Sequence, residues 1–272
     1  MGINLVVALG VEAAPLVERY RLQLVQGVPP FPLFVGDGLR LIVSGMGRVN
    51  AASAVAWLAG TEYATAGEQP FNQVWLNLGI GGSGAHPQRS LVVAGEVAEA
   101  ASGRCWCIPP ADFSTPVAQI VTVDRPQADY DRPVVYEMEA SGFLAAARRI
   151  GQRRRVHCAK VISDGPESPI ARLDGESVGR LIAGAMAEIE TLLSRLSGLR
   201  AVASESAQTP DAEVFLLRWE FSVEQICRLQ RLLRRALRAG IVIEMDELAG
   251  AVDAGALLRA LEAQLVGQTM VS

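Results

Sequence analysis

The feature of this sequence that most constrains its fold is the alternation of short apolar runs with longer helix-like stretches over about the first 200 residues. Apolar runs without polar interruption are typical of strands buried on both faces of a sheet. The expected strands cover residues 3–9, 39–44, 73–78, 90–98, 120–123, 134–136 and 156–162. The expected helices cover residues 49–59, 141–150 and 174–196. This order predicts an α/β fold, a three-layer domain with a mixed, largely parallel twisted sheet flanked by helices.

The pattern changes near residue 200. Residues 200–210 are polar and rich in Ala and Ser, which is typical of a linker. Only helical patterns follow: Ser222 and Gln225 form a capping box before an amphipathic helix, and Asp253 caps a last helix. We therefore expect residues 1–198 to form the α/β domain and residues 199–272 a small helical C-terminal extension. An arginine-rich face on the first of these helices could suggest an anionic partner, but neighbouring acidic residues favour a solvated surface.

The composition limits the classes of function. With 29 acidic and 25 basic residues the net charge is −4, which gives no reason to expect a nucleic-acid partner. No uncharged run reaches the roughly 18 residues of a membrane helix, and the apolar N-terminus lacks a basic region, so we expect no membrane segment or leader. The four cysteines and the two histidines, His86 and His157, complete no ligand pattern. We therefore expect a cytoplasmic protein without metal or cofactor. Among the basic residues, Lys160 is the one lysine.

The candidate site residues follow the expected strands, because ligands of a parallel α/β sheet bind at the carboxyl ends of its strands. Polar or glycine-rich segments stand there at residues 12, 45–48, 79–84, 137–139 and 163–164. Each has an ordinary structural alternative: Glu12 alone could be a solvated residue, and Asp164 could cap a turn. The glycine segment lacks the spacing of a nucleotide-binding loop. Their shared position at strand ends is what favours a site.

On these segments the chain resembles the nucleoside phosphorylase and nucleosidase superfamily, and is most similar to methylthioadenosine/S-adenosylhomocysteine nucleosidases. The likeness covers about residues 3–195. Its most specific part is Glu-Met-Glu-Ala at 137–140 with Ile-Ser-Asp at 162–164. Similar segments are Ala-Leu-Gly-Val-Glu ending at Glu12, the Gly-Met-Gly-Arg turn ending at Arg48, and Asn-Leu-Gly-Ile-Gly-Gly at 77–82. Residues 200–272 have no counterpart that we recognise.

The resemblance implies cleavage of the N-glycosidic bond of a purine nucleoside, without a cofactor. Asp164 would protonate the leaving purine, and Glu12 would act as the general base for water. Glu139 would bind the ribose hydroxyls. The other substrate-binding residues that the resemblance implies are Met138, Glu137, Ser163, Gly79, Ile80, Gly81, Arg48 and Lys160. The family is typically oligomeric, so we expect a homodimer or a higher homo-oligomer.

Two alternatives to hydrolysis stay open at this point. A carboxylate at Glu12 would repel phosphate, which favours hydrolysis of a 5′-modified adenosine over phosphorolysis, although Arg48 and Arg89 could bind phosphate. A phosphorylase on the same fold is the first alternative. The second is a catalytically weak protein that binds a nucleoside or a protein partner.

Two departures from the family pattern support that second alternative. Ile80 stands where the family has a serine, and the Gly-Asp-x-Phe base clamp is missing between residues 122 and 134. A third departure is Lys160, which stands where the family has an arginine and keeps the charge. The base and the 5′ substituent of the substrate are therefore left open.

Overall fold

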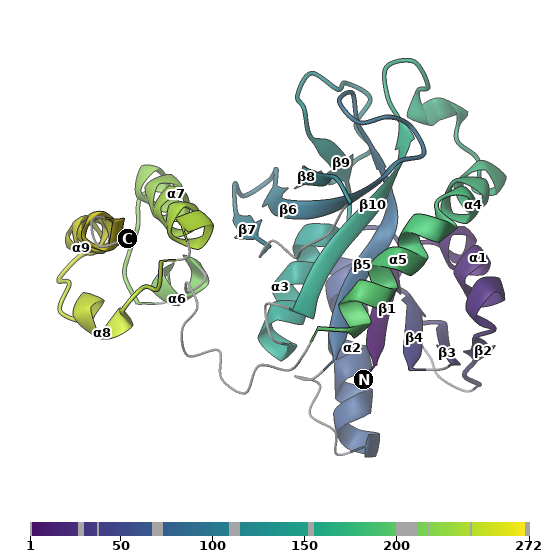
Figure 1. Cartoon of the computed structure of the whole chain (residues 1–272), viewed down its shortest axis with the longest axis horizontal. Coiled ribbons are helices and arrows are strands. Elements are labelled where there is room, and N and C mark those ends of the chain that lie inside the picture. The colour runs from purple at the N-terminus through teal and green to yellow at the C-terminus, as the bar shows by residue number, and fades with distance from the viewer. Residues whose placement is uncertain are drawn as a thin grey trace. The chain divides into compact units, whose positions relative to one another are not determined.

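In a computed structural model, the chain is described at residues 2–26, 30–36, 38–66, 73–108, 115–151, 155–199, 212–216, 218–239 and 241–269. It forms two compact units, Met1–Ala201 and Val202–Ser272. The first unit contains the sheet and its covering helices, and the second contains helices (Figure 1).

One sheet runs through the first unit. Its strands are β1 (Ile3–Val7), β2 (Gln23–Leu24), β3 (Leu33–Gly36), β4 (Leu39–Val43), β5 (Val74–Gly82), β6 (Leu91–Glu99), β7 (Cys105–Cys107), β8 (Val117–Thr122), β9 (Val135–Glu137) and β10 (Val156–Asp164). Their order is β10-β6-β8-β9-β5-β1-β4-β3-β2, with β7 paired to β6. Because β10 also pairs with β5, the strands β5, β10, β6, β8 and β9 close into a ring.

The sheet is mixed, as expected, and among the described strands five pairings are parallel and five antiparallel. β1 pairs in parallel with β4 and β5, β10 with β5, and β8 with β6 and β9. β6 pairs antiparallel with β10, β9 antiparallel with β5, and β3 antiparallel with β2 and β4. The reversal at β6 follows from its short connection to β5, residues 83–90, since a parallel return needs a crossover of about a dozen residues or more.

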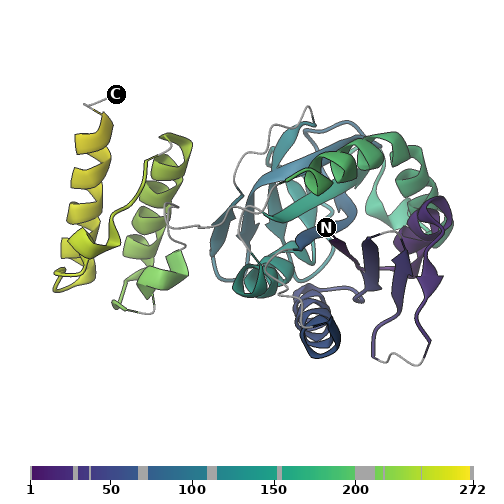
Figure 2. The ribbon, with the colours of Figure 1, turned by 60° about the horizontal axis from the view of Figure 1, so that its bottom comes forward.

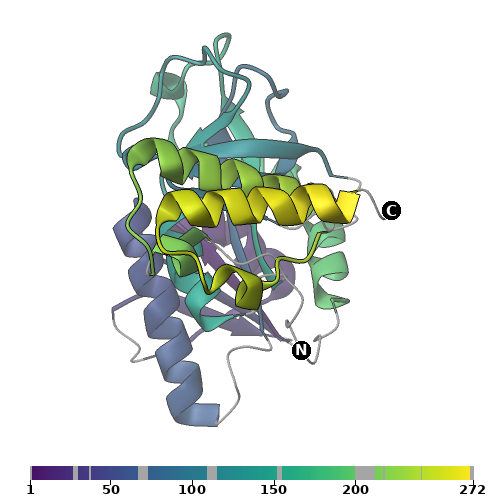
Figure 3. The same cartoon turned by 90° about the vertical axis from the view of Figure 1, so that its left-hand side faces the viewer.

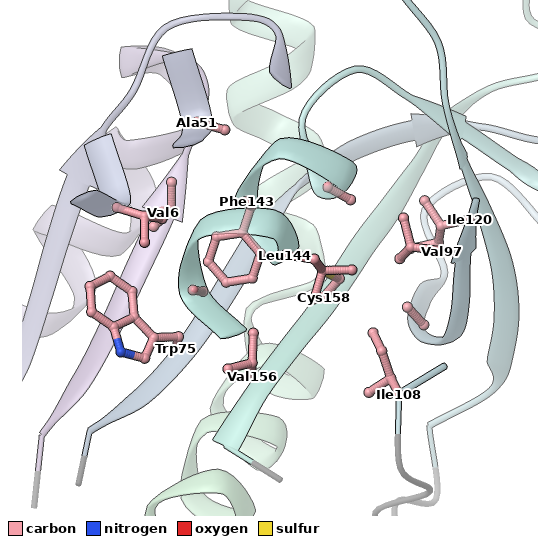
Figure 4. Close-up of a cluster of buried hydrophobic side chains, with 14 of the residues drawn as sticks. Val6, Ala51, Trp75, Val97, Ile108, Ile120, Phe143, Leu144, Val156 and Cys158 are labelled. Carbon is pink, nitrogen blue, oxygen red and sulfur yellow. The ribbon is translucent and has the colours of Figure 1, made fainter. Parts of the chain in front are cut away.

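Helices cover both faces of the sheet, which gives three layers (Figure 2). On one face lie α2 (Arg48–Ala66) and α3 (Ala140–Ile150); on the other lie α1 (Gly10–Tyr20), α4 (Gly175–Gly184) and α5 (Met186–Ser197). Under α3, the side chains of Phe143 and Leu144 pack with Trp75, Val156 and Cys158 (Figure 4). Full burial of such side chains contributes about 1.5–3 kcal/mol each, so this layer holds α3 firmly over the ring.

Several element bounds differ from the expected ones. The glycine segment at 79–82 is the end of β5 and not a loop, because it continues the parallel pairing with β10. The helix expected over 174–196 is two helices, separated at Ala185, whose ψ of 10° breaks the helical geometry. Residue 12 lies in the first turn of α1 and not in a loop after β1.

The second unit has its own apolar core. It contains α6 (Ala212–Leu216), α7 (Val223–Ala239), α8 (Met245–Leu248) and α9 (Ala254–Thr269), and α9 lies alongside α7 (Figure 3). Buried leucines of α7 and α9 pack around Phe215. The capping box is confirmed: Ser222 N–H donates to Gln225 Oε1 at 2.8 Å, and Gln225 N–H donates to Ser222 Oγ at 3.2 Å.

The Asp253 cap is confirmed as well, because its carboxylate accepts the backbone N–H of Ala256 at 2.7 Å. On the arginine-rich face of α7, Arg228 pairs with Glu262 of α9 at 2.7 Å. The linker expected at 200–210 lies outside the described residues. In the described part of the chain, no helix combines the length and the apolar character needed to cross a bilayer.

Candidate active site

Lys160 lies at the centre of a cluster of buried carboxylates. It sits on β10 beside Gly79 of β5, and its side chain is 1% exposed. Its Nζ is 2.8 Å from Glu137 Oε2 and 3.8 Å from Glu139 Oε2. Burial alone would lower the pKa of Lys160, but Glu137 and Glu139 raise this pKa above its ordinary value. The ammonium is therefore charged throughout the physiological pH range.

Glu137 is bound on both carboxylate oxygens by other groups of the protein. Oε1 accepts the hydroxyl of Thr122 at 2.6 Å. Oε2 accepts the backbone N–H groups of Glu139 and Ala140 at 3.0 and 2.8 Å, in addition to its contact with Lys160. The N–H groups at a helix start need such an acceptor, so Glu137 fixes the beginning of α3. Glu137 therefore supports the site by holding Lys160 and the start of α3. Its direct contact with substrate stays a prediction.

Glu12 lies in the first turn of α1, beside the cluster around Lys160. Its Oε2 accepts the N–H groups of Ala8 and Leu9 at 2.9 and 2.8 Å, and its Oε1 accepts that of Ile80 at 3.1 Å. Burial raises the pKa of Glu12, and the charge of Lys160 together with the three N–H groups opposes that rise. A carboxyl group with a raised pKa and fixed orientation is suited to accept a proton near neutral pH.

Gly79 separates Glu12 from Lys160. A Cβ at this position would lie 2.8 Å from Glu12 Oε1 and 3.6 Å from Lys160 Nζ. The absence of a side chain at Gly79 therefore lets the carboxylate and the ammonium approach each other. Next to it, Ile80 is half-buried and contributes its backbone N–H, while Gly81 passes the side chain of Val135.

Glu139 is held from the opposite side by the start of α2. Its Oε1 accepts the backbone N–H of Gly47 at 2.8 Å. Burial is the main cause of the raised pKa of Glu139, and neighbouring Glu137 adds to it. This arrangement depends on Gly142, because a Cβ there would overlap the carbonyl oxygen of Arg48 and separate α3 from α2. Met138, between the two glutamates, is half-buried.

Asp164 lies at the end of β10, four residues beyond Lys160 and beside Gly82 of β5. Its Oδ1 accepts the hydroxyl of Ser163 and its Oδ2 accepts the hydroxyl of Tyr130. Ser163 is itself fixed, because its carbonyl oxygen accepts the amide of Gln88 at 2.8 Å. Four strand residues span at most about 13 Å, a separation that a bound nucleoside and the side chains can bridge.

Arg48 has acidic partners of its own. Its guanidinium pairs with Glu99 at 2.6 Å and with Asp124 at 3.2 Å, and these carboxylates raise its pKa. Its backbone adjoins Gly47, but the structure does not bring its charge into the carboxylate cluster. The other expected cation, Arg89, is exposed.

Tyr130 is a partner of Asp164 that sequence reasoning missed. It contacts Asp164 across 34 positions of the chain. The available signal was weak: Tyr130 is the single aromatic residue between residues 122 and 134, the segment in which the family's base clamp is missing. Thr122 and Gly47 were also missed as partners of the two glutamates. Among the described residues, no group of three or more His, Cys, Asp or Glu side chains could hold a metal ion.

The fold is similar to that of solved methylthioadenosine/S-adenosylhomocysteine nucleosidases. The 5′-methylthioadenosine nucleosidase of Arabidopsis thaliana aligns with a TM-score of 0.59 at 13% identity, over 73% of this chain and 97% of the other. The nucleosidase of S. pneumoniae, solved with the transition-state inhibitor MT-ImmA, aligns at 0.56 and 18%, over 74% and 100%.

The enzyme of Colwellia psychrerythraea, solved with adenine, aligns at 0.54 and 17%, over 73% and 95%. No family model matches the sequence. No curated protein matches it either. The expected resemblance is thus confirmed at the level of the fold.

Proposed function

We propose that this protein is a purine-nucleoside N-ribohydrolase that acts on a 5′-modified adenosine of the methylthioadenosine or S-adenosylhomocysteine type. The observation that carries the proposal is the gathering of Glu12 and Glu139 around the buried ammonium of Lys160, with Asp164 further along the same strand. The similar structures include proteins named as nucleosidases, which supports the same reaction class.

The reaction breaks the bond between C1′ of the ribose and N9 of the purine. The bonding electrons leave with the base, and protonated Asp164 donates its proton to N7 of that base. Glu12 takes a proton from a water molecule while the oxygen of that water bonds to C1′. The products are the free base and the free ribose. Glu139 accepts the ribose hydroxyls and stabilises the positive charge that develops on the sugar.

The charge of the site favours water over phosphate as the nucleophile. The described residues place the carboxylates of Glu12, Glu137 and Glu139 around one ammonium, that of Lys160. Two unit charges 6 Å apart repel by about 3 kcal/mol at an effective dielectric constant of 20. A phosphate dianion carries two negative charges, so a carboxylate would repel it with about twice this energy. Arg48, at the start of α2, is already paired with Glu99 and Asp124.

The remaining residues would shape the substrate pocket. Met138 would pack against the sugar, and Gly79, Ile80 and Gly81 would form the floor beneath it. Ser163 would hold Asp164 in place.

We also propose that the protein is cytoplasmic and forms a homodimer or a higher homo-oligomer. Light scattering coupled to size-exclusion chromatography measures the oligomeric state, and a monomer at micromolar concentration would contradict this part of the proposal.

The function is tested with a panel of nucleosides, incubated with and without phosphate and analysed by chromatography for free base. We expect adenine from methylthioadenosine or S-adenosylhomocysteine in phosphate-free buffer, together with free ribose product. Strict dependence on phosphate, with a ribose 1-phosphate product, would establish a phosphorylase instead. Tight binding without cleavage of any nucleoside would establish a binding protein.

A further inference from the structure

The segment before β9 closes over the end of the site that contains Asp164. Tyr130, in this segment, donates its hydroxyl to Asp164 Oδ2. The segment fits closely against Gly82 at the end of β5 and Gly84 just beyond it: a Cβ at Gly82 would lie 2.8 Å from Tyr130 Cε1, and one at Gly84 would lie 2.9 Å from the carbonyl oxygen of Tyr130. Ser83 adds a hydrogen bond, because its hydroxyl donates to the carbonyl oxygen of Val134 at 2.9 Å.

This closure leaves neither oxygen of Asp164 without a partner. Ser163 donates to Oδ1 and Tyr130 donates to Oδ2. A leaving purine needs one of these oxygens, because the proton that it receives must come from there. Ser163 is adjacent to Asp164 on β10 and is fixed by Gln88, so the group that can give way is Tyr130.

We propose that Tyr130 competes with the leaving base for Asp164 and is therefore a specificity-determining residue of the site. The inference rests on the proposed function. A base enters when it displaces the phenol, which donates a hydrogen bond to Asp164. Asp164 must then carry a proton taken up from solvent, and the base must supply an acceptor such as N7 for that proton. A base without such an acceptor cannot replace the lost hydrogen bond.

The contacts that hold Tyr130 are few enough for a ligand to break. The side chain is half-buried, and its segment has no helix or strand between β8 and β9. Its ring lies 6.4 Å from that of Tyr136, whose hydroxyl donates to Asp131 at 3.3 Å. The flanking residues Arg125, Asp129 and Asp131 are exposed, and Tyr130 packs on the small apolar cluster of Val121, Val134 and Tyr136. The segment can therefore move away without opening either of the large cores of the first unit.

The experiment compares adenine binding by the intact protein with that of Tyr130→Phe and of the matched control Tyr136→Phe. Each variant loses one phenolic hydroxyl from the same region. Isothermal titration calorimetry gives the dissociation constants. We expect Tyr130→Phe to bind adenine about five- to ten-fold more tightly, the worth of one hydrogen bond, and Tyr136→Phe to bind it as the intact protein does.

A second measurement detects the displacement itself. The protein is labelled with 3-fluorotyrosine, and its fluorine resonance for Tyr130 is the one that Tyr130→Phe lacks. Saturating adenine should move this resonance. Equal or weaker adenine binding by Tyr130→Phe, or a resonance that adenine leaves in place, would overturn the competition alone. Absence of adenine binding in all three proteins would overturn the proposed function as well.

Discussion

The ammonium of Lys160 lies 2.8 Å from Glu137 Oε2, with both side chains 1% exposed. Because Glu137 also accepts the first N–H groups of α3, this pair ties strand β10 to the helix that follows Glu139. The single lysine of the chain therefore has a defined place between a supporting carboxylate and the proposed ribose-binding one. A buried pair of this kind costs about 3–5 kcal/mol to break when one partner is removed.

Removal of the Lys160 charge should shift the pH dependence of catalysis. Glu12 must be ionised to act as a base, so activity falls as the pH drops through its pKa, which burial raises above its ordinary value and Lys160 lowers. Lys160→Met should therefore raise this pKa and move the acid limb of kcat/KM to higher pH. A pH–rate profile measures the shift.

The matched control is Lys160→Arg, which keeps the charge and should leave the acid limb in place. Circular dichroism establishes that both variants fold. Identical acid limbs in Lys160→Met and the unchanged protein would contradict a role for this charge in the ionisation of Glu12.

Glu12→Gln should reduce both activity and stability. Turnover should fall by about two to four orders of magnitude, because the amide cannot accept the proton of water. The amide nitrogen would also face an N–H group of Ala8, Leu9 or Ile80 and leave it without an acceptor, at a cost of about 1–3 kcal/mol. Glu18→Gln, on the exposed side of α1, should stay within about 0.5 kcal/mol. Urea unfolding compares the two, and equal midpoints would count against the three bonds to Glu12.

Gly142→Ala should disturb the site from a distance. Its Cβ would lie 2.7 Å from the Cα of Arg48, so α2 must move away from α3 and weaken the bond from Gly47 to Glu139. We expect a loss of about 1–3 kcal/mol in stability and a higher KM. Gly60→Ala in α2 meets no atom within 4 Å and should stabilise the protein by about 0.5–1 kcal/mol. A Gly142→Ala variant as stable as Gly60→Ala would show that the helices do not need this close approach.

The features of the fold that could be predicted are those that a pattern of neighbouring residues in the sequence encodes. Apolar runs placed the central strands correctly, and the caps at Ser222 and Asp253 are sequence signals with a local partner. The ring is not local, since the pairing of β5 with β10 joins segments about 80 residues apart. The exposed two-residue strand β2 carries no apolar run that could reveal it.

The same distinction between local and long-range features holds for the residues of the site. Glu12, Glu139 and Asp164 could be named because they follow strands, but their partners could not. Tyr130 reaches Asp164 through a loop with no regular pattern. The contact of Gly47 with Glu139 depends on how closely two helices approach.

The most direct test of the proposed function is the release of adenine from methylthioadenosine in phosphate-free buffer, measured by chromatography for the unchanged protein and for Asp164→Asn. We predict release by the unchanged protein and a rate about two to four orders of magnitude lower for Asp164→Asn, the usual effect of removing a general acid. Equal rates for the two proteins, or no release by the unchanged protein from methylthioadenosine or S-adenosylhomocysteine, would contradict the assignment of this site as a nucleosidase.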